Sequence, residues 1–153
     1  MVVLYSVFVI NRAGGLIYSQ TIKASANPAG SSLNDQLRLA STFHGLSTIS
    51  RELLVRGDRA KAGADDAAGE TGGIHTIQTE RVKLRAMTTL TGVTFVVVAA
   101  ANAPDLTEFL ERLYRIYVDY ALKNPFYELD MPIKCHLFDH HLSVLITKTT
   151  SSP

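Results

Sequence analysis

The chain has few of the features that mark a secreted or membrane-spanning protein. It contains a single cysteine, Cys135, so it cannot form an internal disulfide, and its N-terminus lacks the basic and apolar regions of a secretory signal. The longest strongly apolar run, residues 95–101, is far shorter than the roughly 20 residues that a membrane-spanning helix needs. We therefore expect a cytoplasmic protein without a transmembrane segment.

The chain also lacks a charge excess of either sign. Its 15 basic and 14 acidic residues nearly cancel, so no net field attracts nucleic acid or anionic lipid. With 153 residues, of which 46% are hydrophobic, it can bury about two thirds of its unfolded surface in one core. We expect a single domain over residues 1–148, with a flexible internal loop at 56–73 and a frayed tail at 149–153.

Motifs for catalysis and cofactor binding are missing as well. Gly14-Gly15 lies in a turn between two predicted strands without a following Lys-Ser/Thr, so it is no phosphate-binding loop. No serine stands in a G-x-S-x-G elbow, and nothing in the sequence indicates that Cys135 is an activated thiolate. We expect no enzyme activity in the chain alone and no cofactor.

One cluster of side chains has the chemistry of metal ligands, but no C-x-x-C or H-E-x-x-H spacing supports it. We favour a polar helix surface over a zinc site and predict no bound metal. The residues of this cluster are Cys135, His136, Asp139, His140 and His141.

Hydrophobic periodicity predicts an α+β domain. Apolar or alternating runs separated by glycine-containing turns predict five strands, and periods near 3.6 predict three helices. The order is β-β-α-β-β-β-α-α, which describes an antiparallel sheet with helices packed on it. The predicted strands cover residues 2–10, 16–19, 74–79, 82–90 and 94–101, and the helices begin near residues 33, 104 and 137.

The first helix carries two apolar stripes and, beside them, the small residues Ser41, Gly45 and Thr48. Glycine costs about 1 kcal/mol relative to alanine inside a helix, so either another backbone packs closely against Gly45 or the residue is merely tolerated on an exposed face. Lys83 and Arg85 form a local basic patch on a predicted strand. They are either solvated or in contact with an acidic partner.

Four stretches of the sequence resemble the synbindin family, the fourth subunit of the TRAPP vesicle-tethering complex. The resemblance implies a longin-like fold and a second longin-like subunit as heterodimer partner. It also implies a non-catalytic role in nucleotide exchange on a Rab-type GTPase, at the surface of the endoplasmic reticulum and Golgi. The stretches are VFVINRAGGLIYSQ, LASTFHGLSTIS, TLTGVTFVVVAA and IYVDYALKNPFYELDMPIKCHLFDHHL.

The same resemblance assigns contacts to particular residues. Because longin-type pairs associate through the first helix and the edge strand after it, we expect the partner subunit there, and we expect the GTPase at the basic strand. The partner contact would comprise Ser41, Phe43, Gly45, Leu46, Thr48, Ile74 and Ile77, and the GTPase contact Lys83 and Arg85.

The chain departs from many animal synbindins in lacking a PDZ-like insertion between the second strand and the first helix. Only the short segment 21–32 occupies that place, so functions of the insertion are not expected here. A coat-adaptor small chain is the alternative trafficking role, because it shares the fold. A SNARE would need a heptad coiled coil and a membrane anchor, which we do not expect from residues 1–153.

Overall fold

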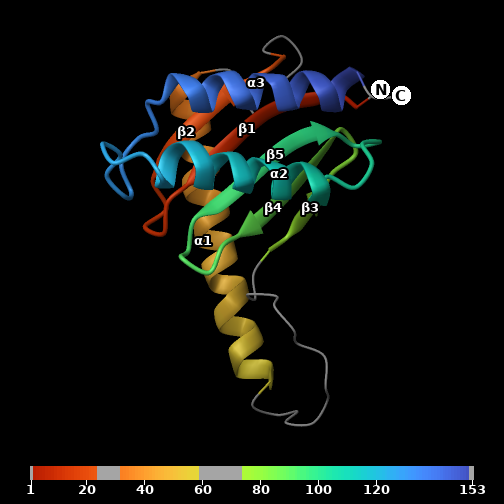
Figure 1. The fold of residues 1–153 in the computed structure, drawn as a ribbon. Coiled ribbons are helices and arrows are strands. Elements are labelled where there is room, and N and C mark those ends of the chain that lie inside the picture. The colour runs from red at the N-terminus through yellow and green to blue at the C-terminus, as the bar shows by residue number, and fades with distance from the viewer. Residues whose placement is uncertain (1, 24–31, 59–73, 152–153) are drawn as a thin grey trace.

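The computed structural model describes residues 2–23, 32–58 and 74–151. Five antiparallel strands form one sheet in the order β2-β1-β5-β4-β3 (Figure 1). This confirms the predicted five-stranded α+β arrangement. The strands are β1 (Leu4–Ile10), β2 (Leu16–Thr21), β3 (Thr76–Gln78), β4 (Val82–Thr88) and β5 (Thr94–Ala100).

The central strands β1 and β5 are buried on both faces, as their continuous apolar runs predict. Side chains alternate between the two faces. In β1, Val7 and Val9 enter one hydrophobic cluster, whereas Phe8 and Ile10 enter the other. The sheet therefore has a core on each side and needs helices on both.

The helices supply those two layers (Figure 1). Helix α1 (Leu33–Asp58) packs on one face, while α2 (Thr107–Tyr117), η2 (Val118–Leu122) and α3 (His136–Ser151) cover the other. Helix η2 continues α2 with a wider turn that the sequence pattern does not predict. None of the helices in the described ranges is long and apolar enough to cross a membrane.

Two helices run further than predicted. Helix α1 continues to Asp58, three residues into the segment 56–73 that was expected to be a loop; residues 59–73 lie outside the described chain. Helix α3 continues to Ser151 within the tail 149–153 expected to fray, and residues 152–153 are again outside. Hydroxyl groups in the last turns of α3 donate to carbonyls four residues back in the same helix. The single-domain assignment stays a prediction.

The connector between η2 and α3 closes one edge of the sheet. Its Ile133 N–H donates to the carbonyl oxygen of Ile17 in β2, at 2.9 Å. Pro132, which precedes it, has no N–H to offer a further strand. The edge at β2 is thus partly occupied by the chain itself, whereas β3 ends the sheet on the other side.

Candidate interaction surface

Helix α1 turns a narrow face to the sheet. Ala40 and Phe43 are buried there against β1 and β5, and the side-chain nitrogen of Gln36 donates to the Thr21 hydroxyl at 3.0 Å. Phe43 is only 4% exposed. Its ring therefore belongs to the core of this chain, so we leave Phe43 out of the partner contact that the sequence suggested.

An apolar line on α1 stays exposed beside this buried face. We define it by the half-buried Leu39 and the exposed Leu46, Ile49 and Leu53, which recur at spacings of seven, three and four residues and so share one side of the helix. Leu46 is 47% exposed and Leu53 64% exposed. In Figure 1 the C-terminal half of α1 extends beyond the sheet. The partner contact expected from the sequence does not include Ile49, although the spacing of residues 46, 49 and 53 places it on the same side of the helix as Leu46.

Strand β3 lies on the same side of the molecule as the start of this line. Leu39 packs against the cluster that also includes Ile74 and Ile77, both half-buried. Thr76 and Gln78 on either side of Ile77 are exposed. Because β3 is the last strand in the sheet order, its outer edge pairs with no strand in the described part of the chain. The apolar line and this edge lie on the same face of the sheet, and each has chemistry suitable for contact with another protein.

The small residues of α1 lie on its open side. The hydroxyls of Ser41 and Thr48 donate to the carbonyls of Leu37 and His44, at 3.0 and 2.9 Å. A Cβ added to Gly45 would meet nothing within 4 Å. Packing within the chain therefore gives no reason for glycine at this position, and the face is free for a neighbouring backbone.

Lys83 and Arg85 point to the opposite face of the sheet from α1, because they alternate along β4 with the buried Leu84. Arg85 donates to the hydroxyls of Thr76, at 2.6 Å, and Thr107, at 3.1 Å. Its side chain is 28% exposed. The structure does not bring this basic pair together with the α1 surface.

The basic pair holds the connection between β5 and α2. Lys83 donates to the carbonyl of Ala103 at 3.3 Å, and Arg85 lies 4.0 Å from the Asp105 carboxylate. Hydrogen bonds from Thr107 lower the pKa of the Asp105 carboxyl, and the positive charges of Arg85 and Lys83 add to this effect. Both side chains therefore have a structural role before any role in binding.

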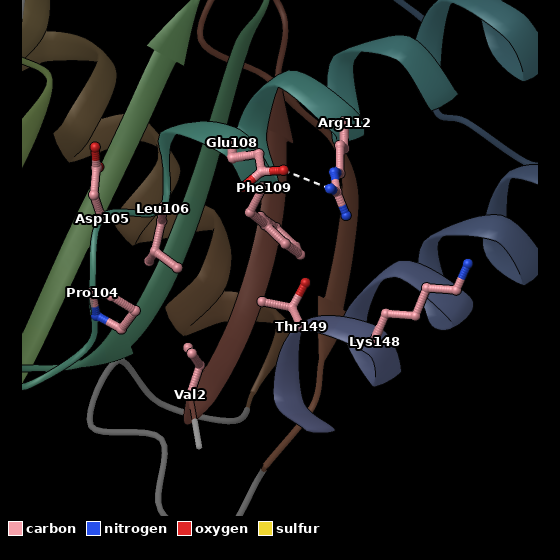
Figure 2. A pocket seen from close by; sticks show the side chains of 9 residues that line it. All are labelled: Val2, Pro104, Asp105, Leu106, Glu108, Phe109, Arg112, Lys148 and Thr149. Carbon is pink, nitrogen blue, oxygen red and sulfur yellow. Dashed lines mark hydrogen bonds and ion pairs between the residues drawn. The ribbon is translucent and has the colours of Figure 1, made fainter. Parts of the chain in front are cut away.

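A pocket of about 300 Å³ lies between the start of α2 and the end of α3 (Figure 2). An ion pair between Glu108 and Arg112 forms part of its rim. Its lining contains neither histidine nor cysteine, so it offers no nucleophile paired with an imidazole base. The lining residues are Val2, Pro104, Asp105, Leu106, Glu108, Phe109, Arg112, Lys148 and Thr149.

Two of the candidate metal ligands, Asp139 and His141, have partners outside the cluster. The Tyr18 hydroxyl donates to Asp139 at 2.7 Å, and the Tyr120 ring stacks on His141 with centroids 4.2 Å apart. His140 meets His141 edge to face. Within the described ranges, no three histidine, cysteine or acidic side chains come together in a way that could hold a metal ion.

The five-stranded sheet with helices on both faces and the exposed apolar line of α1 define a class of small α+β domain with apolar side chains open to contact. Comparison with known proteins names the family. The model of the Sybindin-like family matches residues 4–149. This chain therefore belongs to the Sybindin-like family.

Individual relatives agree with that assignment. "Trafficking protein particle complex subunit 4" of Dictyostelium discoideum is 40% identical over 141 residues, which cover 92% of this chain and 94% of the relative. The human protein of the same name is 39% identical over 113 residues, covering 74% of this chain and 46% of the longer relative. "Trafficking protein particle complex subunit 1" of Dictyostelium discoideum is 25% identical over 97% of both chains.

Among solved structures, a Roadblock/LC7 domain from Streptomyces avermitilis superposes with a TM-score of 0.48. Its sequence identity is 14%, and the match covers 67% of this chain and 72% of that one. At this level the likeness supports no argument about fold or function.

Proposed function

We propose that this chain is a non-catalytic subunit of a TRAPP-type vesicle-tethering complex. The observation that supports this best is the 40% identity to a protein named TRAPP complex subunit 4, which extends over 94% of that relative. The complex would act in transport from the endoplasmic reticulum to the Golgi. The chain would then be cytoplasmic and held at these membranes through its neighbouring subunits.

A second longin-like subunit is the proposed heterodimer partner. The chain is similar to subunit 4 and, at 25% identity, to subunit 1 of the complex, so two subunits of one assembly are related in sequence over their whole lengths. We place the contact at the apolar line of α1 and the edge of β3. Leu46, Ile49 and Leu53 lose apolar exposure on pairing, which favours association by about 25 cal/mol for each Å² buried.

The pair would contribute part of a surface for nucleotide exchange on a Rab-type GTPase. Exchange requires only that the complex bind the nucleotide-free GTPase better than the loaded form, so no catalytic side chain is needed. Lys83 and Arg85 stay the proposed GTPase contact. Because Arg85 also bonds to Thr76 and Thr107, Lys83 is the residue that can report on binding without loss of those bonds.

Pairing is tested with two similarly exposed leucines from opposite faces of the sheet. Leu46 on the apolar line of α1 is 47% exposed, and Leu122 in η2 is 40% exposed. We expect Leu46→Asp to weaken binding to the purified subunit-1-type protein at least tenfold, and Leu122→Asp to change it less than threefold. Isothermal titration calorimetry measures both. Equal effects of the two substitutions, or none, would contradict the proposed contact.

Gly45→Trp tests the small-residue face separately. A Cβ at Gly45 would meet nothing within 4 Å in the free chain, and circular dichroism of the variant checks that the rest of the indole leaves the fold intact. If Ser41, Gly45 and Thr48 meet the partner backbone, the indole blocks the pair and co-purification is lost. Intact co-purification would remove this face from the contact while leaving the apolar line as its site.

The exchange role is tested in the assembled complex. Lys83→Glu reverses one charge and leaves the Arg85 bonds in place. We expect slower release of a fluorescent guanine nucleotide from the GTPase, with the complex itself unchanged in size-exclusion chromatography. An unchanged release rate and GTPase affinity would remove Lys83 from the contact.

A further inference from the structure

The loop between η2 and α3 presents a phenylalanine ring to solvent on a preformed turn. We call residues 124–131 the Phe126 loop. The side-chain oxygen of Asn124 accepts the Phe126 N–H at 3.1 Å, and the Asn124 carbonyl accepts the Tyr127 N–H at 3.1 Å. These two bonds, with Pro125 between them, fix an Asx turn and a β-turn on the same four residues. Phe126 is 95% exposed at its tip.

The far end of the loop is fastened to the first hairpin. The Asn11 amide donates to the carbonyl of Asp130 at 3.2 Å, and Arg12 Nε lies 3.1 Å from the Asp130 carboxylate. The Tyr127 hydroxyl donates to the Met131 carbonyl at 2.9 Å. Asp130 has φ of 66°, a left-handed conformation that costs energy for any side chain but is tolerated best by Asn and Asp. The loop is therefore held in one shape.

Phe126 is exposed although the loop that carries it packs against the core. Tyr127, the next residue, packs against the main hydrophobic cluster. Leu129 and Met131 are 66% and 51% exposed, so three large apolar side chains lie in the open on a segment whose backbone is fixed. Such exposure marks a binding site more often than does a scattered surface leucine.

The loop lies away from the surface proposed for the longin-like partner. The loop is bonded to Asn11 and Arg12 in the β1–β2 hairpin, at one end of the strand order, whereas β3 is at the other end. Figure 1 shows the loop and β3 on opposite sides of the molecule. A subunit located between two neighbours needs two such separate surfaces.

We propose that the Phe126 loop inserts its ring into an apolar pocket of a second TRAPP subunit, distinct from the one that packs on α1 and β3. This inference rests on the proposed function. The pocket accepts one phenyl ring and has a basic rim facing Glu128, which lies between Phe126 and Leu129 and takes part in no ion pair of the described residues.

A protein pocket fits the loop better than a lipid surface does. Anionic membranes attract clusters of lysine and arginine beside apolar side chains. Here the loop carries an exposed glutamate, Glu128, two residues after Phe126, and Arg12 is already paired with Asp130. A single aromatic side chain on a rigid turn is typical of an interface anchor, because little conformational entropy is lost when it binds.

The test compares Phe126→Ala with Leu90→Ala. Leu90 is 94% exposed on the β4–β5 turn, so its truncation removes a similar exposure from another place. Wild type and each variant are paired with the subunit-1-type protein. Each of these pairs is then titrated with every remaining purified TRAPP subunit. We expect Phe126→Ala to weaken binding to one of them at least about 30-fold, as truncation of an aromatic anchor does, and Leu90→Ala to change it less than twofold.

Failure of the inference is distinguishable from failure of the proposed function. If the wild-type chain forms no pair with the subunit-1-type protein and joins no TRAPP subunit, the proposed function fails. If the complex assembles and Phe126→Ala binds every subunit as tightly as wild type, this inference alone fails. The same holds if Leu90→Ala weakens binding equally.

Two further measurements examine the chemistry of the site. Glu128→Lys is expected to weaken the same contact about tenfold by placing like charges together, and unchanged or tighter binding overturns the basic rim. Sedimentation with vesicles of phosphatidylcholine and phosphatidylserine examines the lipid alternative. Vesicle binding that is lost in Phe126→Ala, without an effect on subunit binding, overturns the protein pocket.

Discussion

Arg12 and Asp130, separated by most of the chain, join the tip of the first hairpin to the loop before α3 through an ion pair of 3.1 Å. Arg12 is largely exposed, with 72% of its side chain accessible, so the pair itself contributes little to stability. Its importance is geometric, because Asp130 also accepts a hydrogen bond from Asn11 through its carbonyl and has φ of 66°. Local backbone strain and a tertiary contact coincide at one residue.

Substitution of Asp130 separates the charge from the backbone conformation. Asn tolerates the left-handed region, so we expect Asp130→Asn to lower the free energy of unfolding by less than about 0.5 kcal/mol. Asp130→Ala should lower the free energy of unfolding by about 1–2 kcal/mol, because alanine is strained in the left-handed region. Urea unfolding measures both values. If the two variants are equally destabilised, the charge rather than the conformation is what matters at this position.

Gly14 and Gly45 differ in what a methyl group would meet. Gly14 has φ of 87°, and an added Cβ would lie 2.7 Å from Cδ2 of His44, so Gly14→Ala should cost about 1–3 kcal/mol. Gly45→Ala, on an open helix face, should raise stability by about 0.5–1 kcal/mol. Thermal unfolding of the free chain provides the comparison. A stabilised Gly14→Ala would show that the hairpin turn shifts away from His44 at little cost.

Arg85 and Lys83 should differ in their contribution to folding. Arg85→Ala removes hydrogen bonds to Thr76 and Thr107 that link β3, β4 and α2, and it should cost about 1.5–3 kcal/mol. Lys83→Ala removes one longer bond to a carbonyl and should cost about 0.5 kcal/mol. Chemical denaturation of the two variants decides the matter. Equal, small losses in the free energy of unfolding would mean that Arg85 does not stabilise the fold and is available to bind a partner.

Tyr18 should resist ionisation at alkaline pH. Burial raises the pKa of its hydroxyl above the usual range, and the hydrogen bond to Asp139 with its negative charge raises it further. The neutral phenol is thus favoured in the folded state. Its contribution to stability is complete below the ordinary tyrosine pKa of about 10 and is lost as pH rises above that value.

The measurement is the free energy of unfolding of wild type and Tyr18→Phe across this alkaline range. Wild type should lose stability more steeply with rising pH than the variant, because only wild type has the Tyr18 proton to lose. Asp139→Asn should lower the pKa of Tyr18 without restoring its ordinary value, since burial remains. Parallel pH profiles of wild type and Tyr18→Phe would refute this account.

The sequence predicted best those elements whose burial depends on local periodicity alone. The buried face of α2 shows why: its members Phe109, Leu110, Leu113 and Tyr117 recur with a period near 3.6 residues, which the sequence alone displays. Strands β1 and β5 followed from their apolar runs for the same reason. The family resemblance implied the longin-like fold and the class of partner, which periodicity alone does not indicate.

Other features depend on residues distant in the chain. The buried side of α1 includes Gln36, whose partner Thr21 lies in another element, so polarity alone misplaces it. Phe43 was expected at the partner contact but packs in the core. The hydrogen bond from Arg85 to Thr107 likewise joins β4 to α2, and nothing in the sequence of β4 predicts it.

The hydrogen bond between Ile133 and Ile17 has a consequence for how many chains can join edge to edge. Sheets with two free edges can add neighbours on both sides and grow into fibres, whereas a sheet with one occupied edge can add a strand on one side alone. In this chain the connector, with Pro132 beside Ile133, covers part of the β2 side. Pairing through β3 therefore favours two joined sheets over a growing fibre, which suits an assembly of fixed stoichiometry.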